Sequence, residues 1–120
     1  MKKLTLLLTL TAVAAAGLHA AETTKRDIEV VMKEAMKGDT SLHKKVATGK
    51  GTPEDAAKLL DYVKSLPAES PPAGDAASWK EKTGKLIEAV QAVVDGKPGA
   101  TQSLQTAGNC KACHSEHKGK

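Results

Sequence analysis

The chain has 120 residues and a net charge of +4, and only 2% of its residues are aromatic: one Trp, one Tyr and no Phe. Basic and acidic residues are interspersed, so the sequence lacks the basic face and aromatic platforms of a nucleic-acid-binding domain. A chain of this size needs a well-filled core, and the scarcity of large apolar side chains predicts that another group completes the interior.

Residues 1–20 have the pattern of a secretory signal peptide. Two lysines are followed by an apolar run from Leu4 to Leu18 and by a small residue at Ala20. The run is too short to make a good membrane-spanning helix, although an uncleaved anchor is the alternative. We therefore expect residues 21–120 to form one exported, periplasmic domain that does not insert into a membrane after cleavage.

The first predicted helix covers about 24–47. Its apolar positions recur at alternating steps of four and three residues, which is the spacing of one helix face. Gly38 and Asp39 interrupt this stripe and could kink the helix or split it in two. The stripe consists of Ile28, Met32, Ala35, Leu42 and Val46.

A second helix is clearly marked at its start. Thr52 is the expected N-cap, Pro53 suits the first helical position, and Asp55 lies three residues after the cap. Pro67 follows the expected end of this helix. Its apolar face consists of Ala56, Leu59, Leu60, Val63 and Leu66.

Residues 67–75 contain three prolines and predict an extended, non-helical crossover. The third helix is expected to start at Asp75 or Ser78 and to end near Val94, and the fourth covers about 98–117. No segment shows the alternation of a strand. Four helices with short connections and one longer link predict an all-α fold, an antiparallel four-helix bundle. The apolar face of the third helix consists of Trp79, Thr83, Leu86, Val90 and Val93.

One strong motif carries chemistry, the run of residues 110–114 with the sequence Cys-Lys-Ala-Cys-His. C-x-x-C-H is the attachment signal of c-type haem. Residues three apart share a helix face, so the thiols of Cys110 and Cys113 can form thioethers with the two vinyl groups of one porphyrin. The adjacent His114 offers its imidazole to the iron from the same side. The motif therefore predicts one covalently bound haem c, which would also supply core volume.

Three other chemistries use paired cysteines. A thioredoxin-like CxxC accompanies a βαβ pattern, which this sequence lacks. A structural zinc site needs four ligands, and only His114, His117 and the distant His43 accompany the thiols. A disulfide between Cys110 and Cys113 would close a very small loop and stabilise little. Each of these interpretations explains less of the sequence than haem does.

The sixth ligand of the iron has to come from another helix, because the last helix occupies the near side. Met32 and Met36 lie four residues apart on the first helix, and a Met thioether opposite His gives a high-potential iron suited to electron transfer. Both could also be ordinary core residues. His43 would instead give a bis-His centre and is the less favoured ligand. His117 is expected at the surface or at the haem edge.

Several other side chains have expected roles around the haem. Arg26 is a candidate for contact with the propionates, as are Lys25 and Lys33, although a solvated surface charge is the more ordinary role for each. Trp79 is expected in the core, where it could also pack on the haem edge. All of these contacts presuppose the haem.

An exported chain of this size, with four predicted helices and CxxCH near its C-terminus, resembles the class II c-type cytochromes. These are the cytochromes c prime and their low-spin, Met-ligated relatives. The resemblance covers 22–118 and places the family's thioether bonds at Cys110 and Cys113 and its proximal ligand at His114. It also implies a four-helix bundle with one haem.

Within that family, the resemblance favours the low-spin branch. There the sixth ligand is a first-helix Met that follows an aliphatic residue and precedes a Lys, a pattern that Met32 matches and that leaves Met36 as second choice. Five-coordinate members often carry an Arg four residues after the proximal His, where this chain has Lys118. They also carry a basic residue near the propionates, a role that Arg26 could take. The departure at Lys118 weakens the gas-binding alternative.

The sequence thus predicts a non-enzymatic, periplasmic monohaem cytochrome that carries single electrons between redox partner proteins. The alternative is a five-coordinate protein that binds nitric oxide or carbon monoxide. A haem-free thiol oxidoreductase is the remaining possibility. The bundle could pair into a homodimer, but nothing in the sequence requires it.

Overall fold

Helices and short connections make up the described part of the chain, residues 26–119 of a computed structural model, and this part contains no strand. The predicted signal peptide, 1–20, and Lys25 lie outside the described residues. Within the described range, no helix combines the length and the apolar character needed to span a membrane. The all-α prediction is confirmed for this part of the chain. Its elements are α1 (Ile28–Val31), the π-helix η1 (Met32–Met36), α2 (Leu42–Ala47), α3 (Pro53–Val63), the 3₁₀ turn η2 (Leu66–Ala68), α4 (Ala76–Val94), α5 (Ala100–Ala107) and α6 (Cys110–His117).

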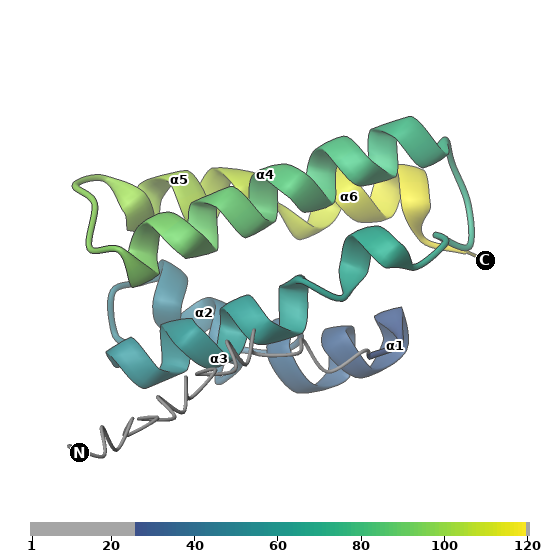
Figure 1. The fold of residues 1–120 in the computed structure, drawn as a ribbon. Helices are drawn as coiled ribbons and strands as arrows, with labels where there is room; N and C mark the ends of the chain where they lie inside the picture. The colour runs from purple at the N-terminus through teal and green to yellow at the C-terminus, as the bar shows by residue number, and fades with distance from the viewer. Residues whose placement is uncertain (1–25, 120) are drawn as a thin grey trace, which may run out of the picture.

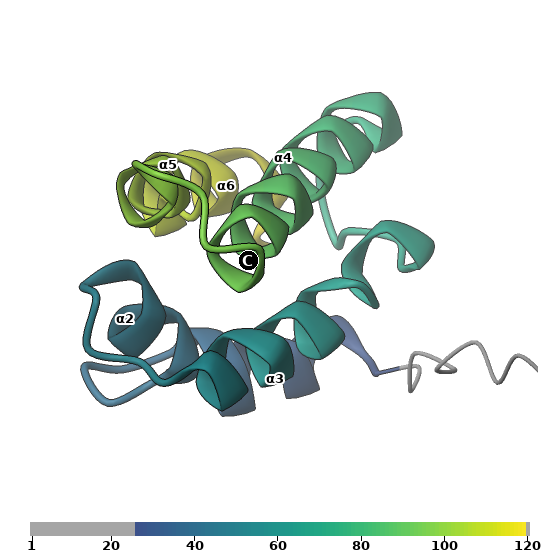
Figure 2. The same cartoon turned by 60° about the vertical axis from the view of Figure 1, so that its left-hand side comes forward.

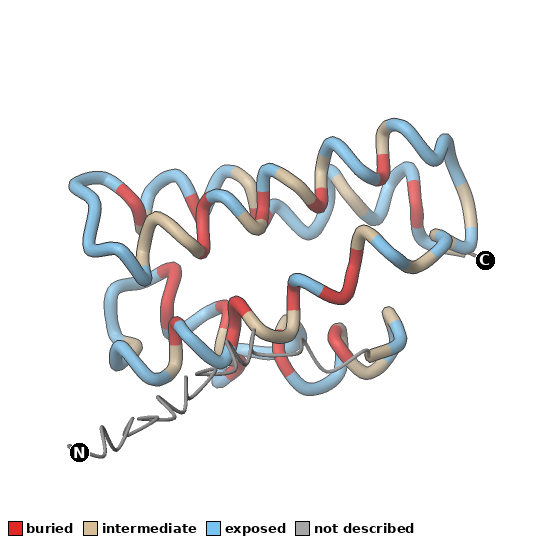
Figure 3. Tube along the Cα trace, viewed as in Figure 1, coloured by how far each residue is buried: buried red, intermediate tan, exposed pale blue. Residues whose placement is uncertain are grey.

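Two layers of helices face each other (Figure 1). One layer contains α4 together with α5 and α6, which run back alongside it, and the other contains α1 to α3. Figure 2 shows the same two layers from a second direction. The most extensive contacts join α4 to α5 and α3 to α4. Buried positions lie mainly along the inner sides of the helices, whereas most of the outer surface is exposed (Figure 3).

The apolar faces of the helices meet in one core. The predicted face of the second helix is buried along its length, and that of α4 is buried except at Val93, which is half-buried. The indole Nε1 of Trp79 donates a hydrogen bond of 2.9 Å to the Leu66 carbonyl, which ties α4 to the turn after α3. Burial of apolar surface stabilises a fold by roughly 25 cal/mol per Å². The predicted core of these two helices is confirmed.

The first predicted helix is split, which is one of the two outcomes expected there. Helix η1 ends at Met36, and α2 begins at Leu42 after a turn in which Gly38 has a φ of +96°. Glycine adopts this left-handed backbone without the steric cost that a Cβ brings. The Ser41 hydroxyl then caps α2 by accepting a hydrogen bond of 3.1 Å from the Lys44 amide. The segment therefore folds as separate short helices.

The starts of α3 and α4 are confirmed. The Thr52 hydroxyl accepts a hydrogen bond of 3.1 Å from the Asp55 amide, and the Asp55 carboxylate accepts one of 3.0 Å from the Thr52 amide. This reciprocal pair is a capping box, and Pro53 follows as the first helical residue. At α4, the Asp75 carboxylate accepts a hydrogen bond of 3.2 Å from the Ser78 amide. Both starts are fixed by contacts between near neighbours in the sequence.

The Pro-rich link departs from the prediction at its start. Pro67 lies inside η2, and the extended backbone begins only at Glu69. A short helical turn accepts Pro near its beginning because the first amides of a helix have no partner within it. The prediction that the whole of 67–75 is non-helical is therefore wrong at its first residues.

The prediction of one continuous helix over about 98–117 is wrong. Helix α5 ends at Ala107, and α6 begins at Cys110 after a break at Gly108 and Asn109. The Asn109 side-chain carbonyl accepts a hydrogen bond of 3.2 Å from the Ala112 amide. An Asn side chain that accepts from the backbone competes with continuation of a helix and favours a new start. The cysteine–histidine motif consequently has a short helix of its own, with its own cap.

Candidate functional site

A cavity of about 1170 Å³ opens beside α6. Residues of α1, η1, α4, α5 and α6 line it, and most of its surface is apolar. Cys110, Cys113 and His114 are among the lining residues, as are Met32 and Met36 of η1. The structure therefore brings the motif and both candidate sixth ligands to one cavity, although they come from opposite ends of the described chain.

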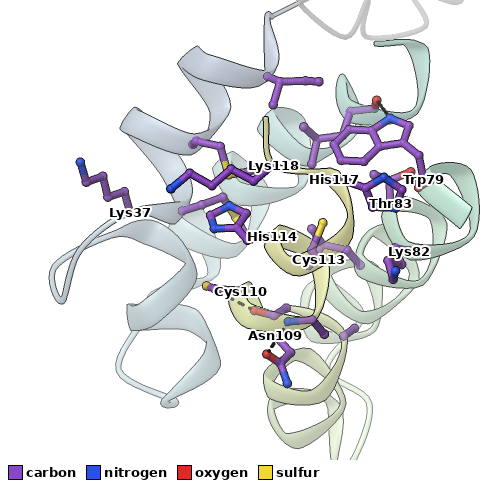
Figure 4. Close-up of a pocket in the computed structure, with 18 of the residues that line it drawn as sticks. Lys37, Trp79, Lys82, Thr83, Asn109, Cys110, Cys113, His114, His117 and Lys118 are labelled. Carbon is purple, nitrogen blue, oxygen red and sulfur yellow. Dashed lines mark hydrogen bonds between the residues drawn. The ribbon is translucent and has the colours of Figure 1, made fainter. Parts of the chain in front are cut away.

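The motif follows one side of α6. Figure 4 shows Cys110 and Cys113 on this helix and the His114 imidazole projecting from it toward the first segment of the chain. Cys110 is exposed, Cys113 is half-buried, and neither forms a disulfide. Thiols three residues apart on a helix lie on one face. The geometry therefore allows two bonds to one planar ring, with the imidazole next to them.

The thiol of Cys113 is half-buried in the wall of the cavity. Burial raises the pKa of Cys113 above its ordinary value of 9.0, and the nearby Lys82 charge only partly opposes this effect.

The expectation of a surface position for His117 is wrong, because the side chain is only 2% exposed. Its Nδ1 lies 3.0 Å from the Ala73 carbonyl oxygen, and its Nε2 lies 3.3 Å from the Ser78 hydroxyl. The ring packs edge-on against Trp79, with 5.4 Å between the ring centres. A Cβ on Gly74 would lie 2.6 Å from Nδ1, so the crossover backbone is pressed against the imidazole. His117 thus ties the crossover to α6 and forms part of the cavity wall.

His43 is not among the residues that line the cavity. It lies on α2, is 9% exposed, and its Nε2 has no hydrogen-bond partner within the described residues. A Cβ on Gly108 would lie only 2.1 Å from that nitrogen. The structure therefore places His43 against the break between α5 and α6. The sequence analysis missed this contact; its only signal was a glycine in the middle of a predicted helix.

The buried imidazole of His43 predicts a pH-dependent stability. Burial, aided by the nearby Lys44 charge, lowers the pKa of His43 from its ordinary value of 6.5. The unfolded chain then binds this proton more readily than the folded one, so stability present above the ordinary pKa is lost as the pH falls through it. We expect His43→Leu to lose less stability than the wild type between about pH 7 and about pH 5. Urea unfolding at both pH values measures the difference. An equal loss in both proteins would contradict the prediction.

Positive charge predominates around the cavity. Five lysines and a single carboxylate, that of Glu29, are among the lining residues. Three of the lysines form ion pairs, and the pair between Lys82 and Glu116 joins α4 to α6. Lys37 and Lys118 have no ion-pair partner in the described part of the chain. This surplus suits a ligand that carries carboxylates. The five are Lys33, Lys37, Lys82, Lys85 and Lys118.

Arg26 is not among the cavity-lining residues. Its Nη1 lies 2.7 Å from the Asp61 carboxylate, and its guanidinium carbon lies 4.1 Å from the centre of the Tyr62 ring. A cation held by a carboxylate and an aromatic face packs the start of the described chain against α3. The structure does not bring Arg26 to the other predicted site residues. The basic side chains that line the cavity are lysines.

Comparisons with known proteins do not indicate a function for this chain. Models of protein families, curated proteins and solved structures give no significant match. Within residues 26–119, no three His, Cys, Asp or Glu side chains gather in a way that could hold a metal ion. The motif of α6, the two methionines and the cavity between them are therefore the basis for assigning a function.

Proposed function

We propose that the protein is a periplasmic monohaem c-type cytochrome, folded as an antiparallel four-helix bundle, that transfers single electrons between redox partner proteins. The observation that carries this proposal is the shared cavity of Cys110, Cys113, His114 and Met32. An attachment motif, an imidazole and a thioether around one largely apolar space are the donors that a six-coordinate haem c requires.

The residues present fit a haem in their chemistry and in their surroundings. Cys110 and Cys113 would hold the porphyrin by thioethers, and His114 would bind the iron from the α6 side. Met32 would bind from the side of η1, with Met36 as the second choice. The haem supplies a reversible one-electron couple when it is bound. No side chain has to act as a catalyst.

The surroundings of the cavity perform the remaining tasks. Its apolar walls exclude water and supply the packing partner that the aromatic-poor chain lacks. Lys37 and Lys118 line the cavity without an ion-pair partner among the described residues, and they would be available to pair with the two propionates. The His117 contacts and the Lys82–Glu116 pair hold α6 against α4, which fixes the motif relative to the opposite wall.

The absorption spectrum of the export-matured protein tests the proposal. We expect a low-spin reduced spectrum with sharp α and β bands that does not change with carbon monoxide, because a thioether occupies the sixth position. A high-spin spectrum that responds to carbon monoxide would instead identify the gas-binding alternative. Absence of covalent haem after acid–acetone extraction would leave only the thiol chemistry. His43→Leu is the matched control: its spectrum should equal that of the wild type, whereas a bis-His centre would lose its ligand.

A further inference from the structure

The two candidate sixth ligands are the first and last residues of a π-helix. The Lys37 amide donates a hydrogen bond of 2.8 Å to the Met32 carbonyl five residues earlier, which defines η1. Such turns contain one residue more than an α-helical turn, are rare, and occur frequently at functional sites. A sequence-based helix assignment has no means of placing one, and here it frames Met32 and Met36.

Both methionines lie at the wall of the same cavity. Each lines it, and each is half-buried against the core. Between them, Ala35 is fully buried, while Lys33 and Glu34 are exposed. The cavity is therefore lined by two thioethers of η1 and by the His114 and His117 imidazoles of α6.

The backbone of η1 is held in place by contacts with the rest of the fold. Val31 and Ala35 are fully buried in the core, and the Tyr62 hydroxyl of α3 donates a hydrogen bond of 2.7 Å to the Glu34 carboxylate. The two methionine side chains are only half-buried and have no such fixed contact, so they are the parts of η1 that can move.

From these observations we infer that Met32 and Met36 are alternative sixth ligands, exchanged by rotation of their side chains on the fixed backbone of η1. The inference rests on the proposed function, because it requires a haem in the cavity. Residues four apart differ by about 6 Å along a helix axis, so one iron can accept only one of the two sulfurs at a time. Methionine has three rotatable side-chain bonds, which lets the second sulfur approach when the first side chain rotates away. The protein would then have two low-spin states with different reduction potentials.

Three leucine variants separate exchange from a fixed ligand. Leucine is close to methionine in volume and removes the sulfur. We expect Met32→Leu and Met36→Leu each to remain low-spin and thioether-ligated but to differ from each other in reduction potential. The double variant should lose the low-spin spectrum and bind carbon monoxide. Glu34→Gln is the control, because it alters an exposed residue of the same turn without removing a thioether, and the Gln side chain still offers an oxygen to the Tyr62 hydroxyl; its spectrum should not change.

Each outcome discriminates between the two proposals. If one single variant becomes high-spin while the other keeps the wild-type spectrum and potential, the ligand is fixed and the exchange is overturned, although the cytochrome assignment stands. If the double variant stays low-spin, neither methionine binds and the exchange fails. If the wild type is itself high-spin, the electron-carrier assignment fails first. The mass of covalently bound haem is measured in every variant, so that loss of haem loading is distinguished from loss of a ligand.

A measurement on the wild type does not depend on how well the variants fold. Nuclear magnetic resonance of the reduced protein should show two sets of methionine methyl signals shifted by the haem ring, assigned to Met32 and Met36. Their intensities should change with temperature as the two populations change. A single set from one residue at all temperatures would overturn the exchange without affecting the proposed function.

Discussion

Replacing both Cys110 and Cys113 by Ser is expected to abolish the covalent haem and to leave a chain with little fixed tertiary structure. The thiols of these residues are the only cysteine sulfurs of the sequence, so no other thioether to a porphyrin can form. Without its occupant, a largely apolar cavity of about 1170 Å³ would collapse or fill with water. We expect a stability loss of about 5 kcal/mol or more, comparable to the whole stability of a small domain.

Mass spectrometry and thermal unfolding followed by circular dichroism measure the two parts of this result. The proteins are made in a host that exports them and attaches haem. Ser115→Ala is a matched control, because Ser115 lies on α6, is exposed and does not line the cavity. It should keep both the haem and the melting temperature. A double cysteine variant that still carries a haem-sized adduct, or that melts like the wild type, would refute the role given to the motif.

Gly108→Ala is expected to destabilise the protein by about 3 kcal/mol, as a buried overpacking substitution does. The new Cβ would lie 2.1 Å from the Nε2 of His43 and 2.9 Å from the Leu104 carbonyl oxygen. His43 is 9% exposed, so its ring has little room to move aside. Because α6 starts two residues after Gly108, the strain also falls on the element that carries the motif.

A double-mutant cycle with His43→Ala tests whether the contact with His43 causes this loss of stability. Shortening His43 removes the nearest contact, so Gly108→Ala should cost about 1–3 kcal/mol less in that background. Gly84→Ala is the matched glycine control: a Cβ there meets nothing within 4 Å, and α4 should gain roughly 0.5–1 kcal/mol. Urea unfolding gives the free energies of unfolding of the four proteins in the cycle and of Gly84→Ala. A Gly108→Ala protein as stable as the wild type, or equally unstable in both backgrounds, would show that the contact with His43 does not limit this position.

The double cysteine variant and Gly108→Ala test different requirements of the site. Under the proposed function, the cysteines decide whether the cavity holds a haem. Gly108 and His43 decide whether α2 can pack against the break that precedes α6. Loss of haem in the Gly108→Ala protein, with both thiols intact, would indicate that the start of α6 has to be correctly placed for attachment or retention.

The starts of α3 and α4 and the cysteine–histidine motif could be predicted because they depend on neighbours in the chain. The capping box joins Thr52 and Asp55, which lie three residues apart, and the sequence predicted the cap at Thr52. For α4 the sequence predicted only a start at Asp75 or Ser78, and the structure shows Asp75 as the cap, with Ser78 as its partner. The buried faces of α3 and α4 follow from helical periodicity. The order of Cys110, Cys113 and His114 on one helix follows from the same geometry.

Tertiary structure alone decided the positions of the histidines and of Arg26. His117 is buried because Ala73 and Ser78, about forty residues away, supply partners for its ring. Arg26 forms an ion pair with Asp61 and does not line the cavity, whereas five lysines do. Periodicity carries no information about such long-range pairs, because each depends on how helices distant in sequence pack. The sequence by itself therefore specified the chemistry of α6, and only packing decided that both methionines of η1 would face it across one cavity.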